Sequence, residues 1–144
     1  MIFNKNNYEI INTKEVYIHD DVLEQLSFDR ENRKLILDMH KYCRIKDNQW
    51  YKVDEKYKII YNDVLGFTMT SCDFWGASER IDTIWVHTSK DYILIPELQK
   101  RLVKESFSSY DISIDYIESM ISFISGDRLR VVSKEIVTEA LKID

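Results

Sequence analysis

A histidine followed by two aspartates, His19, Asp20 and Asp21, is the most conspicuous polar group in the sequence. A His-Asp doublet is the core of metal-dependent phosphohydrolases, in which an imidazole and carboxylates bind the same cation. Those enzymes place another histidine before the doublet, and no histidine precedes His19 in this chain. A strand pattern also follows the triplet. We therefore interpret it as a turn, in which Asp20 or Asp21 caps the chain as it enters a strand.

The segment 70–78 brings hydroxyl groups, a thiol, a carboxylate and a large aromatic ring together at the end of a predicted strand. Loops in such positions often carry function, so this segment is the best candidate for a recognition surface. Trp75 is either a core residue followed by the turn residue Gly76, or an exposed residue that supplies binding energy. The residues that we expect to contact a partner are Asp20, Asp21, Asp73, Phe74, Trp75 and Glu79.

Cys72 and a histidine such as His87 or His40 have the residue types of a nucleophile and its base, because an imidazole lowers the pKa of a nearby thiol. No spacing in the sequence shows that they meet, and a single cysteine in a strand is usually buried. We therefore predict no catalytic residue. The alternative is a small enzyme or ligand-binding protein that uses Cys72, His19 or His87 inside a cavity.

The sequence lacks the residue patterns that several classes of functional site require. Three glycines, far apart in the chain, cannot build a phosphate-binding loop of the dinucleotide or Walker type. The G-x-S-x-G pattern of serine hydrolases does not occur. Cys43 and Cys72 lack the close cysteine and histidine spacing of a zinc site. We expect no cofactor, no metal and two free thiols.

The charge of the chain constrains its partners. Twenty basic and twenty-five acidic residues give a net charge of −5. Proteins that bind the phosphate backbone need clustered Lys and Arg, so we expect no nucleic acid and favour a basic protein as partner. No apolar run has the length of a signal peptide or a membrane span, which predicts a cytoplasmic protein without membrane contact.

The 144 residues are the length of one domain. Alternating apolar residues predict a hairpin over 22–42, a polar loop over 44–56 and further short strands. Pro96 predicts the start of a helix over 96–106. The expected later elements are strands in 57–61, 64–72, 80–88 and 92–95, a hairpin over 116–132 that turns at Gly126, and a short helix over 134–141. For 113–124 a helix also fits.

Seven or eight short strands and two helices predict a mainly β fold, with α+β as the variant, in which antiparallel sheets pack as a sandwich or a partly closed barrel. Its core should contain apolar residues from several strands. Those that we expect there are Leu35, Leu37, Phe67, Met69, Trp85 and Ile121.

Four short features recur together in a known group of proteins. They are His19-Asp20, the strand that runs into Asn62-Asp63-Val64, the break at 72–78 and the turn at 125–127. Together they resemble small, mostly uncharacterised bacterial β-rich proteins found beside polymorphic toxin genes and proposed as immunity proteins. The likeness spans 19–132. It implies a cytosolic, non-enzymatic protein that occludes a cognate toxin, and it transfers no catalytic residue.

The sequence therefore favours a protein-binding module over an enzyme. Nine tyrosines and three tryptophans weakly support a protein partner, because these residues are enriched at interfaces. A third hypothesis is a structural subunit of a homo-oligomer, in which an edge strand such as 80–88 pairs with its copy.

Overall fold

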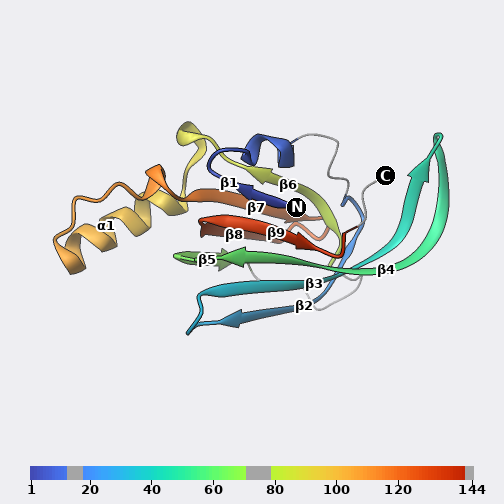
Figure 1. Cartoon of the computed structure of the whole chain (residues 1–144), viewed down its shortest axis with the longest axis horizontal. Coiled ribbons are helices and arrows are strands. Elements are labelled where there is room, and N and C mark those ends of the chain that lie inside the picture. Colours follow the sequence, from blue (N-terminus) through green and yellow to red (C-terminus); the bar gives the residue numbers. More distant parts are fainter. Residues whose placement is uncertain (13–17, 71–78, 142–144) are drawn as a thin grey trace.

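Two antiparallel sheets face each other in the computed structural model, which describes residues 1–12, 18–70 and 79–141 (Figure 1). One sheet has five strands in the order β1-β9-β4-β3-β2, and the other has four in the order β5-β8-β7-β6. The strands are β1 (Ile2–Asn4), β2 (Val22–Asp29), β3 (Lys34–Lys46), β4 (Gln49–Asn62), β5 (Gly66–Met69), β6 (Ile81–Val86), β7 (Ile117–Phe123), β8 (Arg128–Ser133) and β9 (Glu135–Glu139). The helices are η1 (Tyr8–Asn12), η2 (Ser89–Asp91), α1 (Leu94–Ser106) and η3 (Ile112–Ile114).

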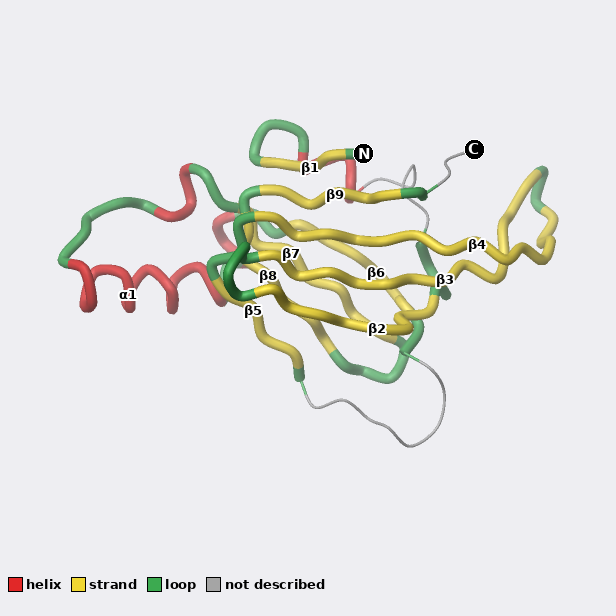
Figure 2. Tube along the Cα trace, turned by 60° about the horizontal axis from the view of Figure 1, so that its bottom comes forward, coloured by secondary structure: helices red, strands yellow, loops and turns green. Residues whose placement is uncertain are grey.

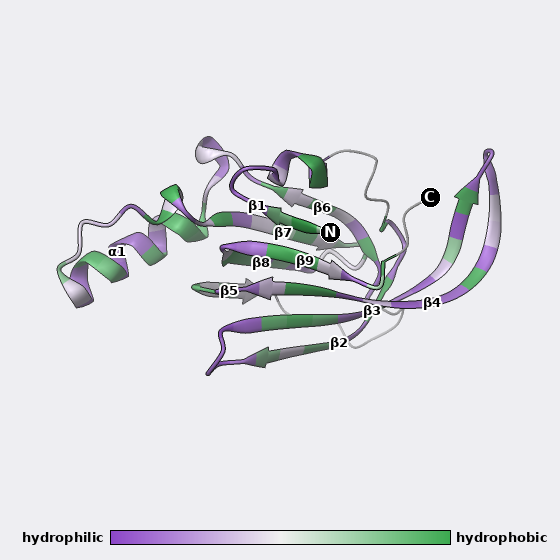
Figure 3. Cartoon of the chain, viewed as in Figure 1, coloured by the Kyte–Doolittle hydropathy of each residue, from purple (hydrophilic) through white to green (hydrophobic). Residues whose placement is uncertain are grey.

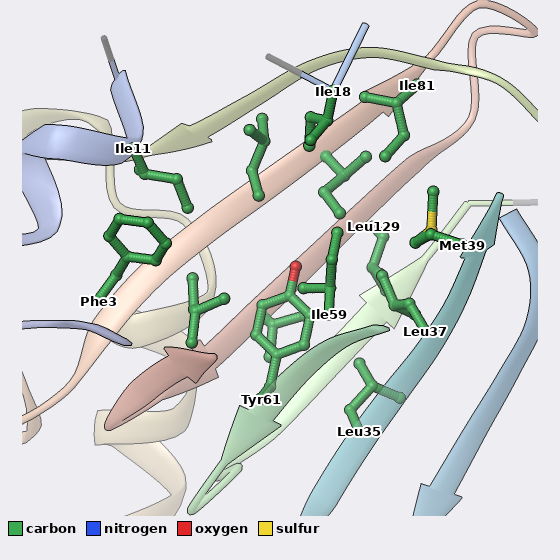
Figure 4. Packing of buried hydrophobic residues seen from close by; sticks show 14 of the residues in the cluster. Phe3, Ile11, Ile18, Leu35, Leu37, Met39, Ile59, Tyr61, Ile81 and Leu129 are labelled. Atoms are coloured by element: carbon green, nitrogen blue, oxygen red, sulfur yellow. The ribbon is translucent and has the colours of Figure 1, made fainter. Parts of the chain in front are cut away.

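The core lies between the two sheets, as Figure 4 shows. Successive side chains of a strand point to opposite faces, so one apolar residue in two is enough to cover the inner face of each sheet. In β3 the buried apolar residues are Leu35, Leu37 and Met39, and in β4 they are Tyr57, Ile59 and Tyr61. Their counterparts in the second sheet include Ile81, Ile121, Leu129 and Val131.

The sheets also meet through the backbone at one corner. Val22 of β2 forms a β-bridge with Arg80, just before β6. The amide of Asp20 donates to the carbonyl of Ile81 at 2.8 Å, and the amide of Ile81 donates to the carbonyl of Asp21 at 2.9 Å. This corner fixes the start of β2 against the start of β6.

The predicted fold class is confirmed. The protein is mainly β, and its described residues form two antiparallel sheets and one α-helix, without closure of the sheets into a barrel. The strand alternative for 113–124 is confirmed by β7, which pairs with β8 through a turn that contains Gly126 at φ 97°. The helix predicted over 96–106 is present as α1 and begins two residues earlier, so the strand expected over 92–95 is wrong.

The helix predicted over 134–141 is wrong, because β9 occupies this region. Ile136, Val137 and Thr138 are β-branched residues, which favour strands. The strand also pairs on both sides, with β1 and with β4. Hydrogen bonds to two neighbours stabilise the extended conformation of so short a segment.

Most of the residues predicted for the core are in it. Leu35, Leu37 and Ile121 are fully buried, and Phe67 and Met69 are partly buried and pack against the core cluster. Trp85 is the exception, because it is 46% exposed while its neighbours Ile84 and Val86 are buried. A shift of one residue reverses the face of a strand, and here the two smaller apolar residues take the inner face.

A second, smaller apolar cluster attaches α1 to the sandwich. Leu94 and Ile95 are buried in it, and Leu98 packs against it from the next turn. Helix α1 lies close to β5 at Gly66, where an added Cβ atom would lie 3.1 Å from both methyl carbons of Leu98. Leu102 also packs against this cluster, and α1 extends away from the sheets, as Figure 2 shows.

A fully buried carboxylate holds the first turn of α1. Glu118 of β7 accepts hydrogen bonds from the backbone amides of Ile93 at 2.9 Å and Ile95 at 2.7 Å. These amides are among those that a helix leaves without partners at its N-terminus. Arg130 of β8 donates to the same carboxylate at 2.5 Å and balances its charge. Glu118 thus supplies the cap that the side chain of Ile93 cannot provide.

The longest departure from the prediction is the region 44–56, expected as a polar loop. It is instead the continuation of β3 and β4, joined by the two-residue turn Asp47-Asn48. Both turn residues have positive φ, 53° and 61°, as a type I′ turn requires. The two strands run well beyond the rest of the sandwich, opposite the end that carries α1 (Figures 1 and 2).

In the described ranges, no helix combines the length and the apolar character that a membrane crossing needs. The longest one, α1, has thirteen residues.

Removing the carboxylate of Glu118 should destabilise the protein strongly. Glu118→Ala leaves Arg130 without its charge partner and two amides without their acceptor, which should lower the free energy of unfolding by about 3–5 kcal/mol. Urea denaturation of the parent and the variant measures this difference. The control is Glu97→Ala, which removes an exposed carboxylate of α1 and should cost less than about 1 kcal/mol. A Glu118→Ala loss as small as that of the control contradicts the capping role.

Candidate functional site

The residues predicted to form a partner surface differ in where the structure places them and in how exposed they are. Asp20 is half-buried, and Glu79 lies beside it at the corner, where the carbonyl of Glu79 accepts from the amide of Leu23 at 2.8 Å. The structure thus brings these two residues together, but the carboxylate oxygens of Glu79 are buried and are not presented to a binding protein. Asp73, Phe74 and Trp75 lie outside the described residues. Asp21 was expected on the surface, and this is wrong because its side chain is buried.

Asp21 is the centre of a buried polar cluster. The ammonium of Lys41 lies 2.9 Å from one of its carboxylate oxygens and 3.1 Å from the other. The hydroxyl of Tyr57 donates to the same carboxylate at 2.5 Å. Burial raises the pKa of Asp21, whereas the hydrogen bonds from Tyr57 and Lys41 oppose that rise. Burial and the adjacent carboxylate raise the pKa of Tyr57, so its hydroxyl stays protonated and donates.

This cluster joins three strands at one point. Asp21 immediately precedes β2, Lys41 lies in β3 and Tyr57 in β4. All three side chains are almost inaccessible to solvent, at 2–3%. A substrate could not reach them in this arrangement, and each polar group is directed at another. The cluster therefore fixes the strands rather than performing chemistry.

A second ion pair lies further along the same two strands. The guanidinium of Arg44 contacts the carboxylate of Glu55 through two nitrogens, with Nε at 2.9 Å and Nη2 at 2.6 Å from Oε2. Two-pronged contacts of this kind hold both side chains in a defined geometry. Arg44 is largely buried, so its charge is neutralised within the protein.

His40 bridges two carboxylates on the same strands. Its Nδ1 lies 2.6 Å from Glu24 of β2, and its Nε2 lies 2.5 Å from Asp54 of β4. Ionised carboxylates only accept hydrogen bonds, so both ring nitrogens must donate and the ring is an imidazolium. The hydrogen bond to Glu24, followed by that to Asp54, raises the pKa of His40 against the opposing effect of burial. The ring also stacks on Tyr42 at a centroid distance of 4.0 Å.

Beyond the Asp21 cluster and His40, β3 and β4 form a two-stranded ribbon, which we call the arm (residues 42–53) and which includes Arg44. β2 pairs with β3 only as far as His40, and β9 pairs with β4 only as far as Lys58. The register is irregular between Lys41 and Cys43, where the arm begins. Figure 3 shows hydrophobic and hydrophilic residues interleaved along it.

The arm exposes large apolar side chains. Ile45 and Trp50 lie directly opposite each other, and Arg44 lies opposite Tyr51. Opposed residues of a ladder share a face, so Ile45 and Trp50 form one face, and Tyr51 belongs to the other. The exposed fractions are 58% for Trp50, 44% for Tyr42, 40% for Tyr51 and 39% for Ile45. The sequence prediction missed all four, although the Asp47-Asn48 dipeptide between two alternating runs was a signal for this hairpin.

Among the described residues, the two histidines named in the enzyme alternative, His19 and His87, lie apart. His19 contacts the carbonyl of Asp82 at 2.9 Å, at the start of β6, whereas His87 follows the end of that strand. Five residues of extended chain separate Asp82 from His87, a distance of about 17 Å. Cys72 lies outside the described residues. Neither histidine lines the pocket of about 310 Å³ that lies beside Glu24 and Lys56.

Two further observations concern ligands and oligomers. Over residues 1–12, 18–70 and 79–141, no three His, Cys, Asp or Glu side chains gather as metal ligands would. β6 is an edge strand of its sheet, but Asn12 bonds both the amide and the carbonyl of Val86. Pairing of β6 with a second copy would have to displace these bonds.

Comparison of the chain with protein-family models, curated proteins and solved structures finds no match. The resemblance to immunity proteins therefore stays a prediction from short motifs. Any argument about function rests on the geometry of the chain itself, in which the arm is the most distinctive exposed feature.

Breaking the buried cluster at Lys41 should be costly. Lys41→Met leaves the buried carboxylate of Asp21 without its cation, which should lower the free energy of unfolding by about 3–5 kcal/mol. The matched control is Lys52→Met on the exposed part of the arm, with an expected change within about 0.5 kcal/mol. Equal effects of the two substitutions in urea denaturation would show that the cluster does not stabilise the strands.

His40 should make stability depend on pH. Its pKa is raised in the folded protein, so its contribution is fully present below the unfolded value of 6.5 and is lost as the pH rises through the folded value. The free energy of unfolding of the parent should therefore decrease over this interval relative to that of His40→Gln. Urea denaturation of both proteins across a pH series gives the difference, and a difference that is flat with pH would refute the double carboxylate contact.

Proposed function

We propose that this chain is a protein-binding module that contacts its partner through the arm. The observation that carries the proposal is a two-stranded ribbon, formed where β3 and β4 run beyond their neighbouring strands, that exposes Ile45, Trp50 and Tyr51. An isolated hairpin of two strands is marginally stable in water and gains stability when something packs against it. Trp and Tyr are also the residue types that most often dominate the energy of protein interfaces.

The base of the arm is suited to this role. The contacts of Asp21, Lys41 and Tyr57 hold the two strands where they leave the sandwich, and the Arg44–Glu55 pair holds them further out. A surface that is ordered before binding loses less conformational entropy when the complex forms. The arm therefore presents its aromatic side chains on a preorganised support.

The arm is also protected against uncontrolled strand pairing. Exposed strand edges aggregate unless charges or irregularities prevent it. Here the irregular register between Lys41 and Cys43 disturbs the ladder. Lys46 adds charge beside the turn, and Lys52, opposite Cys43, adds charge near the base of the arm. These features favour contact with a specific partner over pairing with any available strand.

The resemblance to immunity proteins extends the proposal to a cognate toxin as the partner, which the arm would occlude. The net charge of −5 favours a partner that is basic overall. The free thiol of Cys43, exposed on the arm, is compatible with the reducing environment of a cytoplasmic protein. No catalytic step belongs to this function.

Shortening Trp50 should abolish most of the binding. In affinity capture from the cells that produce the protein, followed by titration of the purified partner, Trp50→Ala should weaken binding by at least about tenfold, as expected for an interface anchor. The substitution removes an exposed side chain, so the fold should persist, and thermal denaturation checks this.

Trp85→Ala is the matched control, because Trp85 is a second exposed tryptophan that lies on the other sheet. It should bind the partner as the parent does. If Trp50→Ala binds with the affinity of the parent, or if Trp85→Ala loses as much affinity, the arm is not the contact surface.

A further inference from the structure

The arm differs in charge from the rest of the molecule. Its twelve residues include three basic side chains, Arg44, Lys46 and Lys52, and one acidic side chain, Asp47, for a net charge of +2. The whole chain has a net charge of −5, so the remaining residues carry −7. An acidic body thus carries a cationic arm. A partner that binds the arm interacts most strongly with the charge of the arm, because that charge is nearest.

The arm's two lysines are available for a partner. The charge of Arg44 is used within the protein by Glu55. Among the described residues, by contrast, no carboxylate lies within 4 Å of the ammonium group of Lys46 or Lys52. Lys52 shares a ladder face with Ile45 and Trp50, whereas Lys46 lies next to the turn on the opposite face. A cation therefore stands on the same face as the exposed tryptophan.

Resting on the function proposed above, we infer that the arm binds an acidic site on its partner protein, in which an apolar pocket receives Trp50 and carboxylates pair with Lys46 and Lys52. Complementary charges around an apolar anchor select the correct partner and speed association. The partner can be basic elsewhere, where it faces the acidic body. The inference concerns only the site that the arm enters.

Single-stranded nucleic acid is the other ligand that combines negative charge with flat apolar groups. Its affinity depends on the number of phosphates that cations neutralise. The arm offers only two unpaired lysines, and the remaining residues carry a net charge of −7 that repels a phosphate backbone. The charges of this chain therefore favour an acidic protein.

The test uses the folded full-length chain and a display library of random peptides. Peptides are selected on the parent and depleted on Trp50→Ala, and the enriched sequences are then synthesised and titrated. They should be net acidic and contain apolar residues. Lys46→Glu combined with Lys52→Glu should weaken their binding at least about tenfold, and added salt should weaken it as well. Lys100→Glu combined with Lys104→Glu, on the exposed face of α1, makes the same change of charge as a control and should leave affinity unchanged.

The outcomes separate this inference from the function proposed above. Peptides that need Trp50 but are net basic, or that tolerate both arm lysine substitutions, overturn the inference and leave the arm as a protein-binding surface. A library without any peptide that depends on Trp50 overturns both. Tighter binding of oligo(dT) than of the acidic peptides, lost in the arm variants, assigns the arm to nucleic acid. Self-association in sedimentation experiments that the arm lysine substitutions abolish assigns it to a second copy of the chain. Either result overturns the inference.

Discussion

The arrangement of the molecule depends on one constraint, which is that β3 and β4 are longer than the strands beside them. β2 accompanies β3 only to His40, and β9 accompanies β4 only to Lys58. Beyond these points no other strand of the described ranges pairs with the ribbon, so the apolar core between the sheets does not extend along it. Buried and paired charges take the place of that core at the base, and the apolar side chains further out remain exposed. The arm is therefore a consequence of strand length.

Both projections of the molecule are attached in the same physical way. A buried carboxylate, Asp21, joins the arm to the sandwich, and another, Glu118, joins α1 to it at the opposite end. Each carboxylate satisfies a cation and further donors that would otherwise be left unpaired. Taking such charges out of water is costly, so they add little to net stability, but they require one specific geometry. The buried charges therefore hold the arm and α1 in one conformation, and a preorganised binding surface needs such a fixed conformation.

The sequence predicted the elements that have a core on one face and failed where this condition does not hold. Leu35 and Leu37 alternate with polar residues because one face of β3 is buried there. In the arm neither face meets a core, so its composition resembles that of a loop. Trp85 has an apolar residue on each side in the sequence, so alternation alone does not predict whether Trp85 or its two neighbours face the core. The burial of Asp21 depends on Lys41 and Tyr57, and no local pattern reveals contacts over such distances in sequence.

The arm, and not the sandwich, is the surface proposed to contact a partner. Photo-crosslinking in the producing cells tests this proposal without knowledge of the partner's identity. A photoreactive p-benzoylphenylalanine is placed in one protein at Trp50 and in another at Trp85, two exposed tryptophans of the two different sheets. If the arm is the contact surface, position 50 gives a discrete crosslinked adduct and position 85 gives none. An adduct from position 85 alone, or none from position 50, would contradict the proposal.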